Sequence, residues 1–276
     1  MKVKSDFFRY SHQKTIGMVD WEGYIDATPA GCGFGRIRCE RILRSSAPGL
    51  ASDIILFSLR IEGFMKDSCS LFSEEVDLFF YTPKQCEILR STVIGIAGAG
   101  GIGSNCATIL VRSGFTRFVI ADFDCVTATN LNRQTFNAKH IGRLKVECLA
   151  EICSEINPQV QITTVSIRID QVCVHRIFDQ CDIIIEAFDD AAAKALLFSE
   201  YLHTSKLLIG VNGIAGIGNS DAIKTTAIRE SCFMVGDNSS EACETLKPYA
   251  PRVITAAAKM ADIALFKTLC PLKRCD

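Results

Sequence analysis

The chain has 276 residues, of which 48% are hydrophobic and 22% are charged, enough for one large domain or two unequal domains around a sizeable core. The formal net charge of −1 lacks the basic excess typical of nucleic-acid-binding proteins, so a nucleic-acid partner is not expected. No apolar run approaches the roughly 18 residues that span a bilayer, and the first residues, MKVKSDFFRY, lack the apolar core of a signal peptide. We therefore expect a cytoplasmic protein with no membrane contact.

Cysteine is unusually frequent, with 14 residues in the chain. Disulfide scaffolds are typical of small secreted domains, whereas this chain is long and rich in aliphatic residues, so most thiols are expected to be reduced and buried. No C-x-x-C pair occurs, which argues against a structural zinc site built from four cysteines.

Residues 1–88 do not follow a regular alternation of strands and helices. Residues 54–61 and 76–80 have the apolar character of strands. We interpret this region as a small, separate α/β unit of unknown role.

Residues 89–276 show a different pattern, in which strand-like and helix-like segments alternate. Strands are expected at residues 93–96, 118–121, 160–167, 183–185 and 207–211, and helices at residues 102–113, 143–156 and 191–202. A short antiparallel pair, 222–228 with 232–235, and a closing helix at 253–269 follow. This alternation predicts an α/β fold with a Rossmann-like, mainly parallel sheet and helices on both faces.

A glycine-rich turn follows the first of these strands and opens the first helix. It reads Gly98-Ala-Gly-Gly-Ile-Gly103, with Ser104 next. Glycines at such a turn let the backbone approach a phosphate, which the N–H groups of the helix N-terminus then bind. We therefore predict that Gly98, Gly100, Gly101 and Gly103 bind a nucleotide; the alternative is a tight strand-to-helix turn with no ligand.

Two acids, Asp122 and Asp124, follow the next strand, about 20 residues beyond the glycines. An acid at this place suits hydrogen bonding to ribose hydroxyls and is compatible with either NAD or ATP. The alternative is a solvated strand end.

The next segment distinguishes between NAD and ATP as the ligand. It reads Asn130-Leu-Asn-Arg-Gln134 and is followed by Lys145. A dinucleotide has only a pyrophosphate, whereas a triphosphate carries more charge, which Arg133 can clamp with its planar fork and Lys145 can meet with a point charge. An ordinary basic surface loop is the alternative. In combination with the preceding motifs, this segment favours ATP.

Taken together, these motifs resemble those of the ThiF/MoeB/ubiquitin-activating superfamily of adenylyltransferases, over residues from about 88 to 270. The resemblance implies binding of MgATP, with the glycines at the phosphates and Asp124 at the ribose. It places Asn130, Arg133, Gln134 and Lys145 at the triphosphate, and Ser104 and Asp122 beside them.

A further match is Glu186-Ala-Phe-Asp189. The resemblance implies that Asp189 holds magnesium and acts in catalysis with Arg133 and Lys145. Glu186 and Asp190 depart from the family pattern, so the choice among the neighbouring acids stays open, and capping of the following helix is the alternative role for Asp189.

The C-terminal part, with Gly216-Ile-Gly-Asn-Ser220 and Ala250-Pro-Arg-Val253, resembles a short, zinc-free ThiF subgroup of thiamine biosynthesis. This resemblance implies a homodimer and, as partner, a small ubiquitin-like sulfur carrier of the ThiS type, ending in Gly-Gly. Cys232 and Cys243 lie where a covalent link to the carrier could form, but no adjacent basic residue marks either as a thiolate, so both are expected to be buried structural thiols.

The sequence therefore predicts ATP-dependent adenylation of the carrier's C-terminal carboxylate. Three alternatives stay open: adenylation of another carboxylate, such as one on a modified tRNA base, an NAD-dependent oxidoreductase, and a catalytically silent binding module. No RNA-binding motif and no acid/base pair for hydride transfer is visible in the sequence.

Overall fold

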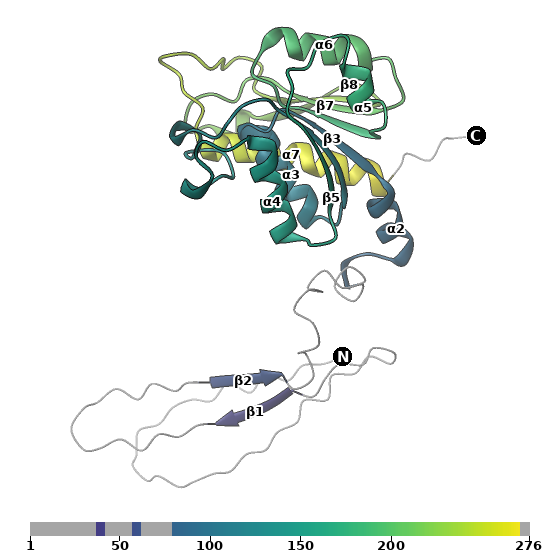
Figure 1. Cartoon of the computed structure of the whole chain (residues 1–276), viewed down its shortest axis with the longest axis vertical. Coiled ribbons are helices and arrows are strands. Elements are labelled where there is room, and N and C mark those ends of the chain that lie inside the picture. The colour runs from purple at the N-terminus through teal and green to yellow at the C-terminus, as the bar shows by residue number, and fades with distance from the viewer. Residues whose placement is uncertain (1–36, 42–56, 62–78, 271–276) are drawn as a thin grey trace, which may run out of the picture. The chain divides into compact units, whose positions relative to one another are not determined.

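The computed structural model divides the chain into two compact units, Met1–Ser68 and Cys69–Asp276. It describes residues 37–41, 57–61 and 79–270 (Figure 1). In the first unit, β1 (Ile37–Arg41) pairs with β2 (Phe57–Ile61) in antiparallel register. β2 lies within the strand predicted at residues 54–61, and the remainder of the predicted N-terminal unit up to residue 78 lies outside the described residues.

The strand predicted at residues 76–80 is wrong where the structure describes it. Phe79 and Phe80 are helical and exposed, and their rings meet edge-on with centroids 4.9 Å apart. A short apolar run fits a strand or a helix turn equally well, so its periodicity could not distinguish the two.

The second unit is built around a seven-stranded sheet in the order β5-β4-β3-β6-β7-β9-β8. Its strands are β3 (Val93–Ala97), β4 (Arg117–Ala121), β5 (Gln161–Val165), β6 (Ile183–Glu186), β7 (Leu207–Val211), β8 (Lys224–Arg229) and β9 (Cys232–Gly236). Every neighbouring pair is parallel except β8 with β9, which is antiparallel. The mainly parallel sheet and the antiparallel pair are therefore both confirmed, and the pair extends the same sheet.

Helices cover both faces of this sheet, as predicted. They are α2 (Pro83–Ser91), α3 (Gly101–Arg112), α4 (Lys145–Ile156), α5 (Val174–Phe178), α6 (Ala191–Tyr201) and α7 (Ala250–Leu269). Figure 1 shows α3, α4 and α7 below the sheet and α5 and α6 above it. Each face has its own cluster of buried apolar side chains. No helix in the described part of the chain is long and apolar enough to cross a membrane.

Two helix starts show how local sequence sets the element bounds. α7 begins at Ala250, three residues before the predicted start, because Pro251 lies in the first turn, where its missing N–H costs no hydrogen bond. α2 begins after Thr82, whose hydroxyl accepts from the N–H of Gln85 while the Gln85 side chain accepts from the N–H of Thr82. α2 contacts α7 and so belongs to the second unit.

The sheet order creates the place for a site. β3 lies between β4 and β6, and Ala97 at the end of β3 is opposite Glu186 at the end of β6. The chain leaves β3 through α3 on one face and leaves β6 through α6 on the other face. Adjacent parallel strands whose connections diverge in this way leave a crevice at their carboxyl ends.

Candidate active site

A cleft of about 520 Å³ occupies this crevice. Its walls come from the loops after β3, β4, β5, β6 and β7 and from the loop between β9 and α7. Every residue predicted for the site lines the cleft, except Gly103 and Ser104.

The glycine loop joins β3 to α3 through very close backbone contacts. Gly98 has a φ of +103°, and a Cβ there would lie 2.7 Å from the carbonyl oxygen of Ala187. A Cβ on Gly103 would lie 1.8 Å from the carbonyl oxygen of Gly98. Gly103 therefore lets α3 pack against the loop, while Gly100 and Gly101 present the start of the helix to the cleft.

Two side chains of α3 hold the loop that carries Arg133. The buried Ser104 hydroxyl accepts from the N–H of Thr135 at 3.2 Å. The Asn105 amide donates to the carbonyl oxygens of Gly101 at 2.7 Å and Arg133 at 2.8 Å. Ser104 thus lies behind the cleft and supports its wall, and sequence reasoning missed Asn105.

The two acids after β4 make different contacts. The Asp122 carboxylate accepts from the N–H of Ala99 at 2.7 Å and from the N–H of Asp124 at 2.8 Å, so it braces the glycine loop. Burial raises the pKa of Asp122, and the nearby Lys145 opposes that rise. Asp124 is half exposed, and its carboxylate accepts from the Lys145 ammonium at 2.7 Å. Both acids line the cleft, and Asp124 is the more exposed of the two.

The segment from Asn130 to Gln134 is ordered by its own hydrogen bonds. The Asn130 side chain accepts from the N–H of Thr127 at 3.0 Å. The Arg133 guanidinium donates to the Thr129 carbonyl oxygen at 3.0 Å and to the side chain of the adjacent asparagine at 2.8 Å. The Gln134 Oε1 is buried with no hydrogen-bond partner in the described part of the chain. Such an atom is costly unless a ligand or water satisfies it.

Three acids near the start of α6, Glu186, Asp189 and Asp190, make different contacts. Glu186 is fully buried and accepts from Lys194 and from the N–H of Phe188. Asp190 caps α6 by accepting from the N–H of Ala193 at 2.8 Å. Asp189 lines the cleft and forms no hydrogen bond or ion pair within the described ranges. The capping role belongs to Asp190, which leaves the Asp189 carboxylate available to a ligand.

Several lining residues carried no motif in the sequence. After β5, Arg168 lies with its guanidinium 5.8 Å from the ring centroid of Phe123 and 3.6 Å from Asp190. Asn212 follows β7, and Ser240 lies in the loop before α7. Their position after strand ends was the only signal that could have indicated them.

The two cysteines considered for covalent chemistry differ. Cys232 is buried in β9, and burial raises the pKa of its thiol. Cys243 is exposed, and a hydrogen bond with the Thr245 hydroxyl lowers its pKa. The expectation of a buried thiol was wrong for Cys243, because it lies in the loop between β9 and α7, outside the sheet.

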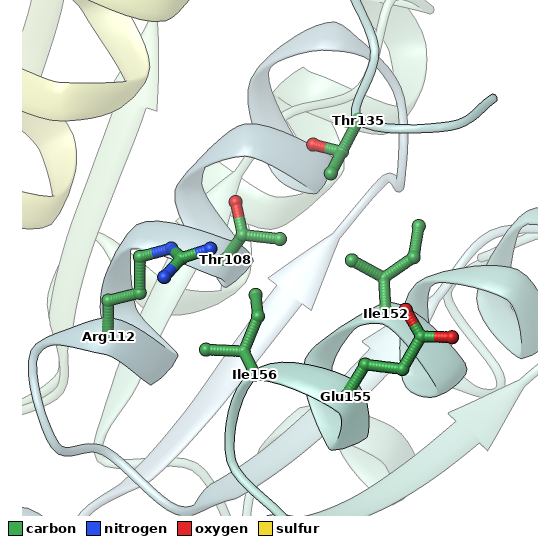
Figure 2. A pocket seen from close by; sticks show the side chains of 6 residues that line it. All are labelled: Thr108, Arg112, Thr135, Ile152, Glu155 and Ile156. Carbon is green, nitrogen blue, oxygen red and sulfur yellow. The ribbon is translucent and has the colours of Figure 1, made fainter. Parts of the chain in front are cut away.

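A second cavity, of about 450 Å³, lies between α3 and α4 (Figure 2). Thr108 and Arg112 of α3 face Ile152, Glu155 and Ile156 of α4, with Thr135 at one end. It contains none of the predicted site residues.

The fold and the cleft together define a nucleotide-binding α/β protein of the Rossmann-like type. Residues 72–269 match the model of the ThiF family. The chain therefore belongs to the ThiF family, within the ThiF/MoeB/ubiquitin-activating superfamily of adenylyltransferases, as the motifs predicted. The matches do not single out the thiamine subgroup.

Similar curated proteins include two named tRNA threonylcarbamoyladenosine dehydratase. The one from Bacillus subtilis is 31% identical over 131 residues, 47% of this chain and 52% of the relative. The one from Haemophilus influenzae is 34% identical over 146 residues, 51% of this chain and 54% of the relative. The adenylyltransferase and sulfurtransferase UBA4 of Candida glabrata is 30% identical over 131 residues, 47% of this chain and 30% of that protein. The chain thus spans about half or less of the length of these relatives.

Solved structures show the same fold. The E. coli tRNA N6-threonylcarbamoyladenosine dehydratase TcdA, in complexes with AMP and with ATP, has a TM-score of 0.65 at 21% identity, covering 71% of this chain and 93% of that chain. E. coli MccB with ATP has a TM-score of 0.53 at 21% identity, covering 67% of this chain and 57% of that chain.

Proposed function

We propose that this protein uses MgATP to adenylate a carboxylate. The observation that carries the proposal is the convergence in one cleft of the N-terminus of α3, Asp124, Arg133, Lys145 and Asp189. Membership of the ThiF family supports it, and so do the AMP and ATP complexes of the similar TcdA structures.

The contacts suggest where each part of ATP would bind. The phosphates would meet the free N–H groups at Gly100 and Gly101, where the dipole of α3 favours an anion. The ribose would meet Asp124. Lys145 lies beside that acid and would contact the phosphates next to the ribose, with Arg133 further along the triphosphate.

The cleft also fits a magnesium ion bound together with the triphosphate. Mg²⁺ in such sites takes one or two protein carboxylates and completes its shell with phosphate oxygens and water. Asp189 offers a carboxylate with no other partner in the described part of the chain. The metal would neutralise charge on the triphosphate.

The reaction is a displacement at the α-phosphate. A carboxylate oxygen of the substrate forms a bond to the α-phosphorus, the bond from that phosphorus to the bridging oxygen breaks, and pyrophosphate leaves with the electron pair. The products are an acyl-adenylate and pyrophosphate. The carboxylate is already ionised, so the protein needs no side-chain nucleophile. Arg133 and Lys145 would position the triphosphate and stabilise the negative charge of the leaving group.

For the substrate, we infer a carboxylate on a threonylcarbamoyl-modified adenosine of tRNA, in place of the ThiS-type carrier and of the expectation from net charge that no nucleic acid is bound. Support comes from the two relatives named for this specificity, which are matched over more than half of their own length, compared with 30% for UBA4 of Candida glabrata. The Gly-Gly terminus of a ubiquitin-like sulfur carrier is the second candidate, because UBA4 is similar over the same length of this chain.

Exchange of labelled pyrophosphate into ATP tests both the adenylation reaction and the identity of the substrate. We expect exchange with tRNA that carries threonylcarbamoyladenosine and none with the same tRNA lacking the modification. Exchange only with a Gly-Gly carrier would show that the carrier, and not tRNA, is the substrate. A protein that binds NADH tightly and ignores MgATP would refute adenylation and favour an oxidoreductase.

A further inference from the structure

An ion pair in the cleft wall, between the buried Glu186 and the partly exposed Lys194, is not used by the proposed chemistry. Glu186 is the last residue of β6 and is fully buried, and Lys194 lies in α6. The Lys194 Nζ lies 3.0 Å from each carboxylate oxygen of Glu186 and 3.2 Å from the carbonyl oxygen of Val211. These three acceptors match the three N–H donors of an ammonium group. Lys194 lines the cleft, but all of its donors already have protein partners.

The Glu186–Lys194 pair joins separate segments of the cleft wall. The Glu186 carboxylate accepts from the N–H of Phe188 at 2.8 Å, in the loop that carries Asp189, and the Lys194 ammonium donates to the carbonyl oxygen of Val211, the last residue of β7. The residue after Val211, Asn212, also lines the cleft. The pair therefore connects the loop after β6, the first turns of α6 and the end of β7.

An ion pair with a buried partner is a weak source of stability, because the cost of removing the Glu186 charge from water offsets its attraction to Lys194. Replacing both partners with neutral residues of similar shape is often neutral for folding, whereas removing one partner leaves an uncompensated buried charge. Fixed geometry is therefore a better explanation for this pair than stability.

We propose that Glu186 and Lys194 are positioning residues that hold the loop after β6 so that Asp189 meets the magnesium ion of MgATP. This inference rests on the proposed function. It deepens that function by assigning a role to two residues that do not contact the reacting atoms. Residues that orient a metal ligand typically change metal affinity by about 10- to 100-fold when they are replaced.

The test uses the full chain with Glu186→Gln and Lys194→Met combined, which removes both charges and keeps the side-chain lengths. AMP binding without magnesium should stay within about twofold of wild type, because Asp189 is not needed for it. The magnesium concentration that gives half-maximal ATP binding, followed by calorimetry, should rise about 10-fold or more. The matched control is Lys139→Met with Glu155→Gln, an exposed pair at 3.4 Å, which should change neither quantity.

Glu186→Asp is the second variant, for use if the double variant does not fold. It keeps both charges but shortens the carboxylate by one methylene, so it should shift the magnesium dependence in the same direction. Lys194→Arg keeps a cation with several donors, so it should retain most of the wild-type magnesium affinity.

Unchanged magnesium dependence in a folded double variant or in Glu186→Asp would overturn the positioning role and leave the proposed function intact. An equal loss of AMP and MgATP binding would also overturn it, since the pair would then support the whole cleft. A wild-type protein that does not bind MgATP would refute both proposals.

Discussion

Replacement of Arg133 with alanine is the most direct test of how the cleft recognises a triphosphate. The guanidinium is held by the Thr129 carbonyl oxygen at 3.0 Å, and the backbone of Arg133 is held by Asn105 at 2.8 Å. The side chain is therefore ordered before ATP binds, and little entropy is lost when it meets the phosphates. A hydrogen bond to a charged group contributes about 1.5–3 kcal/mol. Its loss should lower turnover by roughly 10- to 150-fold.

The assay compares pyrophosphate exchange with AMP binding. Arg133→Ala should lower exchange by the factor above while the Kd for AMP changes less than about twofold, because AMP lacks the β- and γ-phosphates. Arg133→Lys keeps the charge but loses the planar fork, so it should restore only part of the rate. Arg112→Ala, which removes an arginine from the cavity between α3 and α4, is the control and should change neither quantity.

Two results would refute this reasoning. Intact exchange in Arg133→Ala would show that the guanidinium does not act on the triphosphate. An AMP affinity that falls as far as the exchange rate would show that Arg133 supports nucleotide binding in general.

Three further predictions concern other parts of the chain. A shortened chain beginning at Cys69 should still bind ATP in calorimetry, because it contains the whole second unit; a folded protein without binding would show that the first unit completes the site. Hydrogen bonds to Asp179 and Glu200 raise the pKa of His175 above its ordinary 6.5, so their stabilisation is fully present below pH 6.5 and is lost as the pH rises through the folded pKa. An NMR titration should show this raised pKa, and Asp179→Asn should lower it; a midpoint at or below 6.5 would contradict the contact. Cys243 should react with iodoacetamide before Cys106, whose burial raises its pKa to about 12, and peptide mass spectrometry that finds the reverse order would be inconsistent with this structure.

The sheet and the glycine loop were predictable from sequence because their signals are local. A β-branched run, a glycine cluster and an amphipathic stretch follow one another within about 20 residues from Val93 to Arg112. The structure gives the expected strand, turn and helix, with helix bounds within one residue of the prediction. The region before residue 79 carried weaker signals, and the strand predicted through Phe79 and Phe80 is a helical segment there.

The candidate site was predictable in its residues but less so in their orientations. The spacing from the glycines does not distinguish Asp122 from Asp124, and only the family resemblance assigned the ribose to Asp124; in the structure Asp122 binds backbone N–H groups and Asp124 is the more exposed acid. The neighbouring acids Glu186 and Asp189 differ in the same way, because Glu186 ends a strand whose residues are all buried. These differences depend on tertiary packing, which motif spacing does not encode.

The close backbone contacts at Gly98 and Gly103 affect how this site can be mapped. An added methyl group would collide with carbonyl oxygens of the main chain, which cannot rotate away as a flexible side chain would. Alanine scanning, the usual way to find residues that touch a ligand, would give strong defects at both positions whether or not either contacts ATP. A loss of activity there would report a broken junction between β3 and α3. At Gly100 the nearest side-chain atom to an added Cβ is 4.0 Å away, so that position accommodates a methyl group and is the informative one for measuring how closely a phosphate approaches.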